Sequence, residues 1–144
     1  MGRNLVESFA RKVVEGFGRQ AFMTTLGAAI ECAAPGTVEI NMPFNPRHTQ
    51  QDGFVHAGVI TSILDSACGY AAYSVAPEGS NVLTVEFKVN LLAPAVGEEF
   101  CARGHVKRAG KTLTVCTADA FASKNGQEKL VATMLATIMA IKPE

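Results

Sequence analysis

The segment from Gly58 to Tyr73 contains only apolar, small, hydroxyl or aromatic side chains, with a single charged exception, Asp65. A helix formed by this segment is too apolar to lie on a protein surface. One strand-like segment precedes it, and several long ones follow. A sheet of such strands can bury a central helix only if it wraps around that helix, so we expect a domain of the α+β class.

Apolar residues also recur every four positions near the N-terminus, at Leu5, Phe9, Val13 and Phe17. Charged side chains fall between them, which is the pattern of a surface helix with one buried stripe. The sequence therefore predicts an N-terminal helix over about residues 3–16.

Five other segments have the composition of strands. Residues 37–42 alternate apolar and polar side chains, and a proline-containing loop then runs to about Gly53. We place the apolar helix at about residues 57–75. Short breaks with Gly or Pro separate the later strands, and Asn125-Gly126 is the clearest hairpin signal. The last four strands are expected to form an antiparallel meander and span residues 82–92, 99–107, 112–123 and 130–141. For residues 130–141, periodicity alone does not distinguish a strand from a helix.

Length and composition limit the classes of function. With 144 residues, we expect one domain spanning residues 1–144. The 13 basic and 13 acidic side chains balance, so no basic field favours nucleic acid or an anionic membrane. The charged N-terminal segment lacks the pattern of a signal peptide, and we expect a cytoplasmic protein whose partners are a small molecule or other protein chains.

The cysteine pattern gives no sign of a metal site. Cys32, Cys68, Cys101 and Cys116 are far apart in the sequence and do not cluster with histidines. All four fall in apolar segments, where a free cysteine behaves as a small hydrophobic residue. We expect buried thiols, no metal and no cofactor.

Asp65 is the residue that most needs an explanation. Burying an unpaired carboxylate costs several kcal/mol, so it must be paired, exposed or used in chemistry. On a helix, Asp65 shares one face with small or polar residues, so it is expected to border a crevice or an interface, unless it is an ordinary solvated position. The small face comprises Gly58, Thr61, Ser62, Asp65, Gly69 and Ala72, and the apolar residues facing elsewhere are Ile60, Ile63, Leu64, Ala67 and Ala71.

The segment before the helix carries a family resemblance. Gln50-x-x-Gly53-x-x-His56-Ala57-Gly58, followed by Asp65, resembles the active-site signature of hotdog-fold thioesterases of the phenylacetate-degradation (PaaI-like) type. Residues 84–95 and 106–113 are similar to that family's next strand and hairpin, so the resemblance covers roughly residues 37–141. It implies a hotdog fold, hydrolysis of an acyl-CoA thioester and a homodimer or dimer of dimers.

The resemblance assigns roles that agree with the chemistry. Thioester hydrolysis needs hydrogen-bond donors for an oxyanion, and the free N–H groups of Ala57 and Gly58 at a helix N-terminus supply them. Relatives commonly have Gly where this chain has Ala57. Asp65 is then the nucleophile or the general base, and the sequence does not choose between the two.

Other matched positions have supporting roles. Gln50 corresponds to a side-chain amide that polarises the thioester, and Thr84 to a residue that orients the carboxylate or the water. His56 either fixes its loop or transfers a proton. Tyr70 and Tyr73 line the acyl pocket or belong to the core, whereas His48 and His105 are expected at the surface. The candidates for the CoA phosphates are Arg103, Lys107, Arg108 and Lys111.

Helix geometry adds a further expectation. Ala57 and Asp65 are eight residues apart, so they lie about 12 Å apart along one helix. Both must approach one reacting centre to within about 3 Å, or through one water. We therefore predict that each site combines Gln50 and the helix start of one subunit with Asp65 of its neighbour.

Two alternatives share the same fold. One is an acyl-CoA-binding module without turnover, and the other is an acyl-thioester hydratase or dehydratase with His56 as the base. Prolines that follow the active-site histidine in dehydratases are missing here, which favours hydrolysis. The acyl group, the choice between CoA and a carrier protein, and the packing of a tetramer stay open.

Overall fold

The computed structural model describes residues 2–142, with side chains from residue 10 onward. In chain order, its elements are α1 (Gly2–Gly18), α2 (Ala21–Leu26), β1 (Ala29–Ala34), β2 (Thr37–Pro43), the short 3-10 helix η1 (Pro46–His48), α3 (Ala57–Val75), β3 (Asn81–Leu91), β4 (Glu99–Ala109), β5 (Leu113–Lys124) and β6 (Gln127–Ile141).

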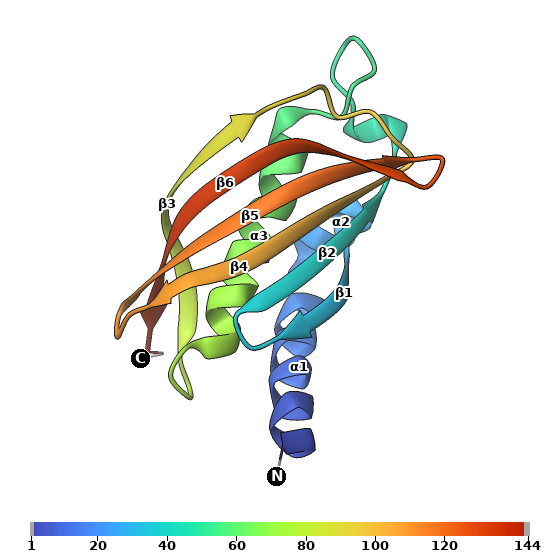
Figure 1. The fold of residues 1–144 in the computed structure, drawn as a ribbon. Helices are drawn as coiled ribbons and strands as arrows, with labels where there is room; N and C mark the ends of the chain where they lie inside the picture. Colours follow the sequence, from blue (N-terminus) through green and yellow to red (C-terminus); the bar gives the residue numbers. More distant parts are fainter. Residues whose placement is uncertain (1, 143–144) are drawn as a thin grey trace.

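The six strands form one antiparallel sheet in the order β1-β2-β4-β5-β6-β3. The sheet curves around α3, and α1 and α2 pack on the side nearest β1 and β2 (Figure 1). The predicted α+β architecture, an antiparallel sheet wrapped around one apolar helix, is confirmed. None of the described helices combines the length and the apolar character needed to cross a membrane.

Helix α3 supplies the centre of the core. Its predicted apolar residues are at most 1% exposed, and the predicted small face stays partly exposed as far as Gly69. Ala72 was expected on the small face that borders a crevice or an interface, but it is 1% exposed because it packs within the hydrophobic core. The buried apolar residues of α3 are Ile60, Ile63, Leu64, Ala67 and Ala71.

The N-terminal helix is also confirmed, and it extends to Gly18. Val13 and Phe17 of the predicted stripe are buried. Leu5 and Phe9 lie outside the described side chains. Helix α2 and strand β1 were not predicted, because one is only six residues long and the other, AIECAA, is rich in alanine, which has a weak strand preference.

The predicted meander of four strands is wrong in one place. Strands β4, β5 and β6 form a meander, but β3 pairs with β6 at the far edge of the sheet. The connection after β3 crosses the ends of two strands: the N–H groups of Leu92 and Ala93 donate to Val131 of β6, and that of Glu98 donates to Ser123 of β5. This crossing leaves β3 as an edge strand beside α3.

A close approach between α3 and β4 gives a stability prediction. A Cβ added at Gly104 would lie 2.5 Å from the carbonyl oxygen of Ala67, so the helix or the strand would have to move. We expect Gly104→Ala to lower the free energy of unfolding by about 1–3 kcal/mol, measured by urea denaturation. Gly18→Ala is the matched control, since a Cβ there meets nothing within 4 Å. Equal stability of the two variants would contradict the close packing of α3 on β4.

Candidate active site

The N-terminus of α3 is capped by its own preceding histidine. His56 Nδ1 accepts a hydrogen bond of 2.8 Å from the Gly58 N–H, and the His56 N–H donates to the His48 carbonyl at 2.9 Å. Gly58 was expected to be a free oxyanion donor, but its N–H is already bonded in this structure. Within the described residues, the Ala57 N–H has no acceptor, so it is the free donor at the helix start.

The Gln50 side chain is oriented by its own loop. Its Oε1 accepts hydrogen bonds from the N–H groups of Asp52 and Phe54. These donors fix which end of the amide faces the loop, because only the oxygen can accept them. The Gln50 NH₂ has no acceptor in the described part of the chain. Gln50 and Ala57 line the same cavity of about 380 Å³, together with Phe54 and residues at the end of β3.

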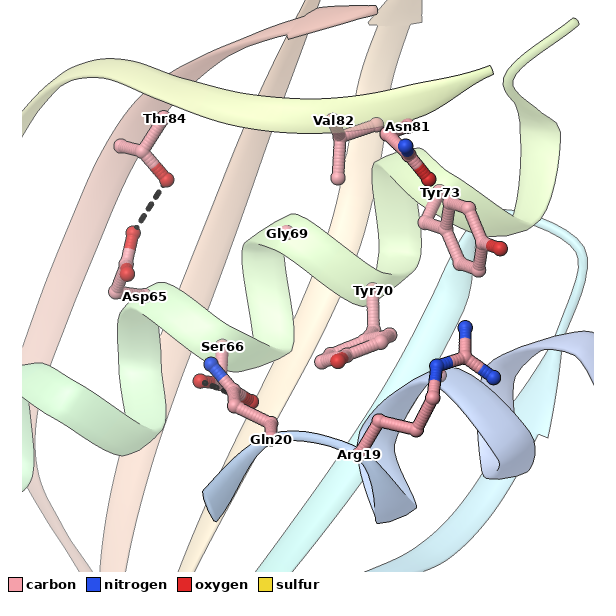
Figure 2. Close-up of a pocket in the computed structure, with 11 residues that line it drawn as sticks. Arg19, Gln20, Asp65, Ser66, Gly69, Tyr70, Tyr73, Asn81, Val82 and Thr84 are labelled. Carbon is pink, nitrogen blue, oxygen red and sulfur yellow. Dashed lines mark hydrogen bonds between the residues drawn. The ribbon is translucent and has the colours of Figure 1, made fainter. Parts of the chain in front are cut away.

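The Asp65 side chain is held in place by a residue of β3. Thr84 Oγ1 donates a hydrogen bond of 2.8 Å to Asp65 Oδ1 (Figure 2). The other carboxylate oxygen accepts no hydrogen bond within residues 2–142. Asp65 is half-buried and lines a second cavity of about 280 Å³. The arrangement fixes the direction of the carboxylate and leaves one oxygen available to a reacting group.

The two parts of the predicted site do not meet within one chain. The cavity at Gln50 and Ala57 and the cavity at Asp65 share no lining residue. Both border α3 and β3, but Ala57 is at the first turn of the helix and Asp65 lies two turns further on. One chain therefore presents the donors and the carboxylate as two separate half-sites.

The buried thiols of α3 and β5 are poor nucleophiles. Cys68 lies one turn further along α3 than Asp65, and its burial raises the pKa far above its usual range. Burial also raises the pKa of Cys116 to about 11. Only a thiolate is an effective nucleophile, and these groups stay protonated at neutral pH. Three cysteines are buried as predicted, whereas Cys32 is exposed because it lies on the edge strand β1.

The four candidate phosphate-binding cations have different environments. Arg103 donates to both carboxylate oxygens of Glu128, at 2.6 and 3.0 Å, and lies 3.5 Å from Glu39, so its charge is already compensated. The three others, Lys107, Arg108 and Lys111, are exposed around the β4–β5 hairpin. This hairpin is at the end of the sheet away from the Gln50 loop (Figure 1).

The remaining predicted residues can also be placed. His105 is exposed as expected. His48 is instead half-buried, because it ends η1 and its carbonyl accepts the His56 N–H, which holds it near the start of α3; its buried Nδ1 has no hydrogen-bond partner among the described residues. Tyr70 and Tyr73 line the Asp65 cavity and also pack against the core. Among the described residues, no three His, Cys, Asp or Glu side chains are close enough to hold a metal ion.

Sequence reasoning missed the contribution of the N-terminal segment to the Asp65 cavity. Gly16, Arg19 and Gln20 line it because α1 packs across Tyr70 and Tyr73. No motif marks these residues. Their role depends on the contact between α1 and α3, which joins segments about 50 positions apart in the sequence.

Comparison with known proteins identifies the family. The profile of the thioesterase superfamily matches residues 52–129. A thioesterase family protein from Silicibacter pomeroyi of known structure is 53% identical, with a TM-score of 0.92 over 94% of this chain and 99% of its own.

Curated relatives match over shorter segments. A putative esterase from Halobacterium salinarum is 32% identical over 65% of this chain, and the chain spans 64% of its length, just under two thirds. Acyl-coenzyme A thioesterase 13 from Mus musculus is 29% identical over 74% of this chain and 73% of its own length. The resemblance deduced from the motifs is confirmed at family level: the chain has the hotdog fold and belongs to the thioesterase superfamily.

Proposed function

We propose that this protein hydrolyses acyl-CoA thioesters to a free acid and CoA, at sites shared between two subunits. The observation that carries the proposal is the pair of complementary half-sites: a carboxylate aligned by Thr84, and two unpaired donors at Gln50 and Ala57. The similarity to acyl-coenzyme A thioesterase 13 supports CoA as the carrier of the acyl group.

The half-sites supply the two requirements of thioester hydrolysis. The Gln50 NH₂ and the Ala57 N–H donate to the thioester carbonyl oxygen, and the positive end of the α3 dipole adds to their effect as negative charge develops there. Asp65 attacks the carbonyl carbon or removes a proton from the attacking water. Collapse of the tetrahedral intermediate breaks the C–S bond and releases the CoA thiolate. If Asp65 acts as the base, the proton that it took from water passes to the thiolate, and the free acid is formed directly. If Asp65 is the nucleophile, an anhydride between Asp65 and the acyl group remains, and a water molecule hydrolyses it to the free acid, restores the carboxylate and supplies the thiolate's proton.

The exposed edge of the sheet supports a shared site. Strand β3 has 11 residues and lies at the edge of the sheet. Its apolar side chains Leu83, Val85, Phe87 and Leu91 are 43–55% exposed. A long apolar edge is a site of unwanted pairing unless another chain covers it. A second copy that pairs along β3 covers it and forms a closed two-fold dimer.

Two-fold pairing also brings the half-sites together. Thr84, which holds Asp65, is near the start of β3, whereas Leu91 borders the Gln50 cavity at its end. In an antiparallel pair with its axis at Phe87, the Thr84 end of one strand lies beside the Leu91 end of the other. The same register sets Glu86 against Lys88 of the partner subunit, a favourable cross-strand pair. Each dimer then contains two complete sites.

The local structure does not favour the dehydratase alternative. That chemistry needs His56 as a free base beside the substrate. Here His56 Nδ1 already accepts the Gly58 N–H, so the ring acts as the cap of α3. His56 is therefore assigned a positioning role, and the chemistry is assigned to Asp65.

The cations at the β4–β5 hairpin give a prediction for CoA recognition. The double variant Arg108→Ala and Lys111→Ala is expected to raise the KM for an acyl-CoA by about tenfold, because two contacts to phosphate are lost. The KM for the corresponding N-acetylcysteamine thioester, which lacks the nucleotide, should be unchanged. Lys124→Ala, at the opposite hairpin, is the control. An equal rise for both substrates would contradict this assignment.

A further inference from the structure

The Asp65 cavity ends at a guanidinium group. From Asp65 and Thr84, the cavity follows α3 for about two turns to Tyr73, and Arg19 lies at that end (Figure 2). Gln20 lines the middle of the cavity, where its Oε1 accepts a hydrogen bond of 3.4 Å from Ser66 Oγ. Its volume is about 280 Å³. An apolar cavity of roughly 150 Å³ is enough to hold benzene, so an acyl group with one ring or a medium chain fits, together with a polar group at its far end.

The position of Arg19 is fixed by the packing of α1. The rings of Phe17 and Tyr70 meet edge to face at 5.5 Å, and Lys12 Nζ lies 4.1 Å above the ring of Tyr73. Gly16 allows this approach, because a Cβ there would lie 3.3 Å from the Tyr70 ring. Arg19 follows directly, and its N–H donates to the Gly16 carbonyl at 3.2 Å. The guanidinium therefore starts from a well-defined backbone position at the cavity.

The charge of Arg19 is uncompensated by the side chains described from residue 10 onward. It forms no hydrogen bond or ion pair with them, in contrast to Arg103, which contacts two glutamates. The neutral polar residues Asn81, Gln20 and Tyr70 also line the cavity. Burial raises the pKa of Tyr70, so the phenol stays neutral and can donate a hydrogen bond.

The cavity is therefore polarised along its length. Asp65 is its one lining carboxylate, and it lies at the end where Thr84 binds it. The far end presents a cation and neutral polar groups. A guanidinium binds a carboxylate through two parallel hydrogen bonds. This end of the cavity therefore favours an acyl group that ends in a carboxylate over one that ends in an apolar group.

From this arrangement we propose that the acyl groups that this protein prefers carry a carboxylate at the end distal to the thioester, and that Arg19 recognises it. This inference rests on the proposed thioesterase function, because it takes Asp65 as the end of the cavity where the thioester reacts. Arg19 selects the substrate and takes no part in bond cleavage.

The test uses substrate pairs that differ at the distal end. The kcat/KM values of adipyl-CoA and hexanoyl-CoA are compared, as are those of 4-carboxybenzoyl-CoA and 4-methylbenzoyl-CoA. Wild-type protein should prefer the carboxylate member of each pair. In Arg19→Gln the ratio within each pair should fall about 10- to 100-fold, the effect expected for a lost charge-assisted hydrogen bond. In Arg19→Lys the ratio should fall less, because lysine keeps the positive charge but lacks the planar guanidinium.

Two controls keep the outcomes distinct. Arg11→Gln removes another exposed arginine, which lies within α1 and does not line the cavity, and it should leave the ratios unchanged. Binding of the same pairs to Asp65→Asn, with and without Arg19→Gln, is measured by calorimetry, so that selectivity is observed without turnover. The inference is overturned if Arg19→Gln changes neither the kcat/KM ratios nor the binding affinities by more than about twofold from the values without this substitution. Arg19-dependent binding without hydrolysis by the wild type would support it and refute the proposed function instead.

Discussion

Replacing Asp65 by Asn is expected to lower kcat for acyl-CoA hydrolysis by about 10²–10⁴-fold, with a small change in KM. The amide cannot attack the thioester or accept a proton from water. Its oxygen can still accept the hydrogen bond from Thr84 Oγ1, so the fold and the shape of the cavity should be retained. The measurement is thiol release under saturating substrate, with circular dichroism to confirm that the variant is folded.

The chain offers a matched control for this substitution. Asp119 on β5 accepts a hydrogen bond of 2.7 Å from Thr133, much as Asp65 does from Thr84, but it lines neither of the two cavities of the candidate site. Asp119→Asn should therefore leave kcat within about twofold of the wild type, as expected for a substitution away from a reacting centre. A comparable loss of kcat in the two variants would show that Asp65 is not a catalytic residue. An Asp65→Asn protein that keeps more than about a tenth of the wild-type activity would show the same.

Activity should return when two inactive variants share a dimer. Asp65→Asn removes the carboxylate and Gln50→Ala removes an oxyanion donor, so each variant alone should be nearly inactive. In a mixed dimer with shared sites, one site receives both substitutions and the other receives neither. Random mixing of equal amounts makes half of the dimers mixed, so about a quarter of the wild-type sites are restored. Co-expression of the two chains with different affinity tags allows the mixed dimers to be isolated and assayed.

The comparison needs proof that mixed dimers formed. Isolation through both tags supplies it, and co-expression of two differently tagged Asp65→Asn chains gives the background. Doubly tagged dimers with activity no higher than this background would contradict the sharing of sites. The thioesterase assignment itself would then still depend on the single variants.

The fold was predictable where the sequence carries a strong local pattern. The apolar residues of α3 and the alternation in β2 indicated a buried helix and a half-buried strand, and both are present. The place of β3 was not predictable, because the short link after it resembles a hairpin connection. The pairing of β3 with β6, together with the hydrogen bonds of Leu92 and Ala93 to Val131, shows that this link crosses the sheet. Strand β1 lacked a signal, since alanine dominates it.

The candidate site was predictable only where its residues belong to a strong local sequence pattern. The motif located Gln50, Ala57 and Asp65 because all three lie on or just before one continuous helix. The hydrogen bond from Gly58 to His56 was not expected, because it depends on the χ angles of a loop residue. Arg19 was missed since its place at the cavity depends on how α1 packs on α3. The predicted sharing of the site between subunits stays a prediction.

The most direct test of the proposed function is to incubate the wild-type protein with aryl- and alkyl-CoA thioesters and to quantify both free CoA thiol and free acid. The account predicts that thiol and acid appear in equal amounts, through many turnovers, and that Asp65→Asn largely abolishes both. Tight binding of acyl-CoA with no thiol released, and with the same affinity in Asp65→Asn, would contradict hydrolysis and identify an acyl-CoA-binding module instead.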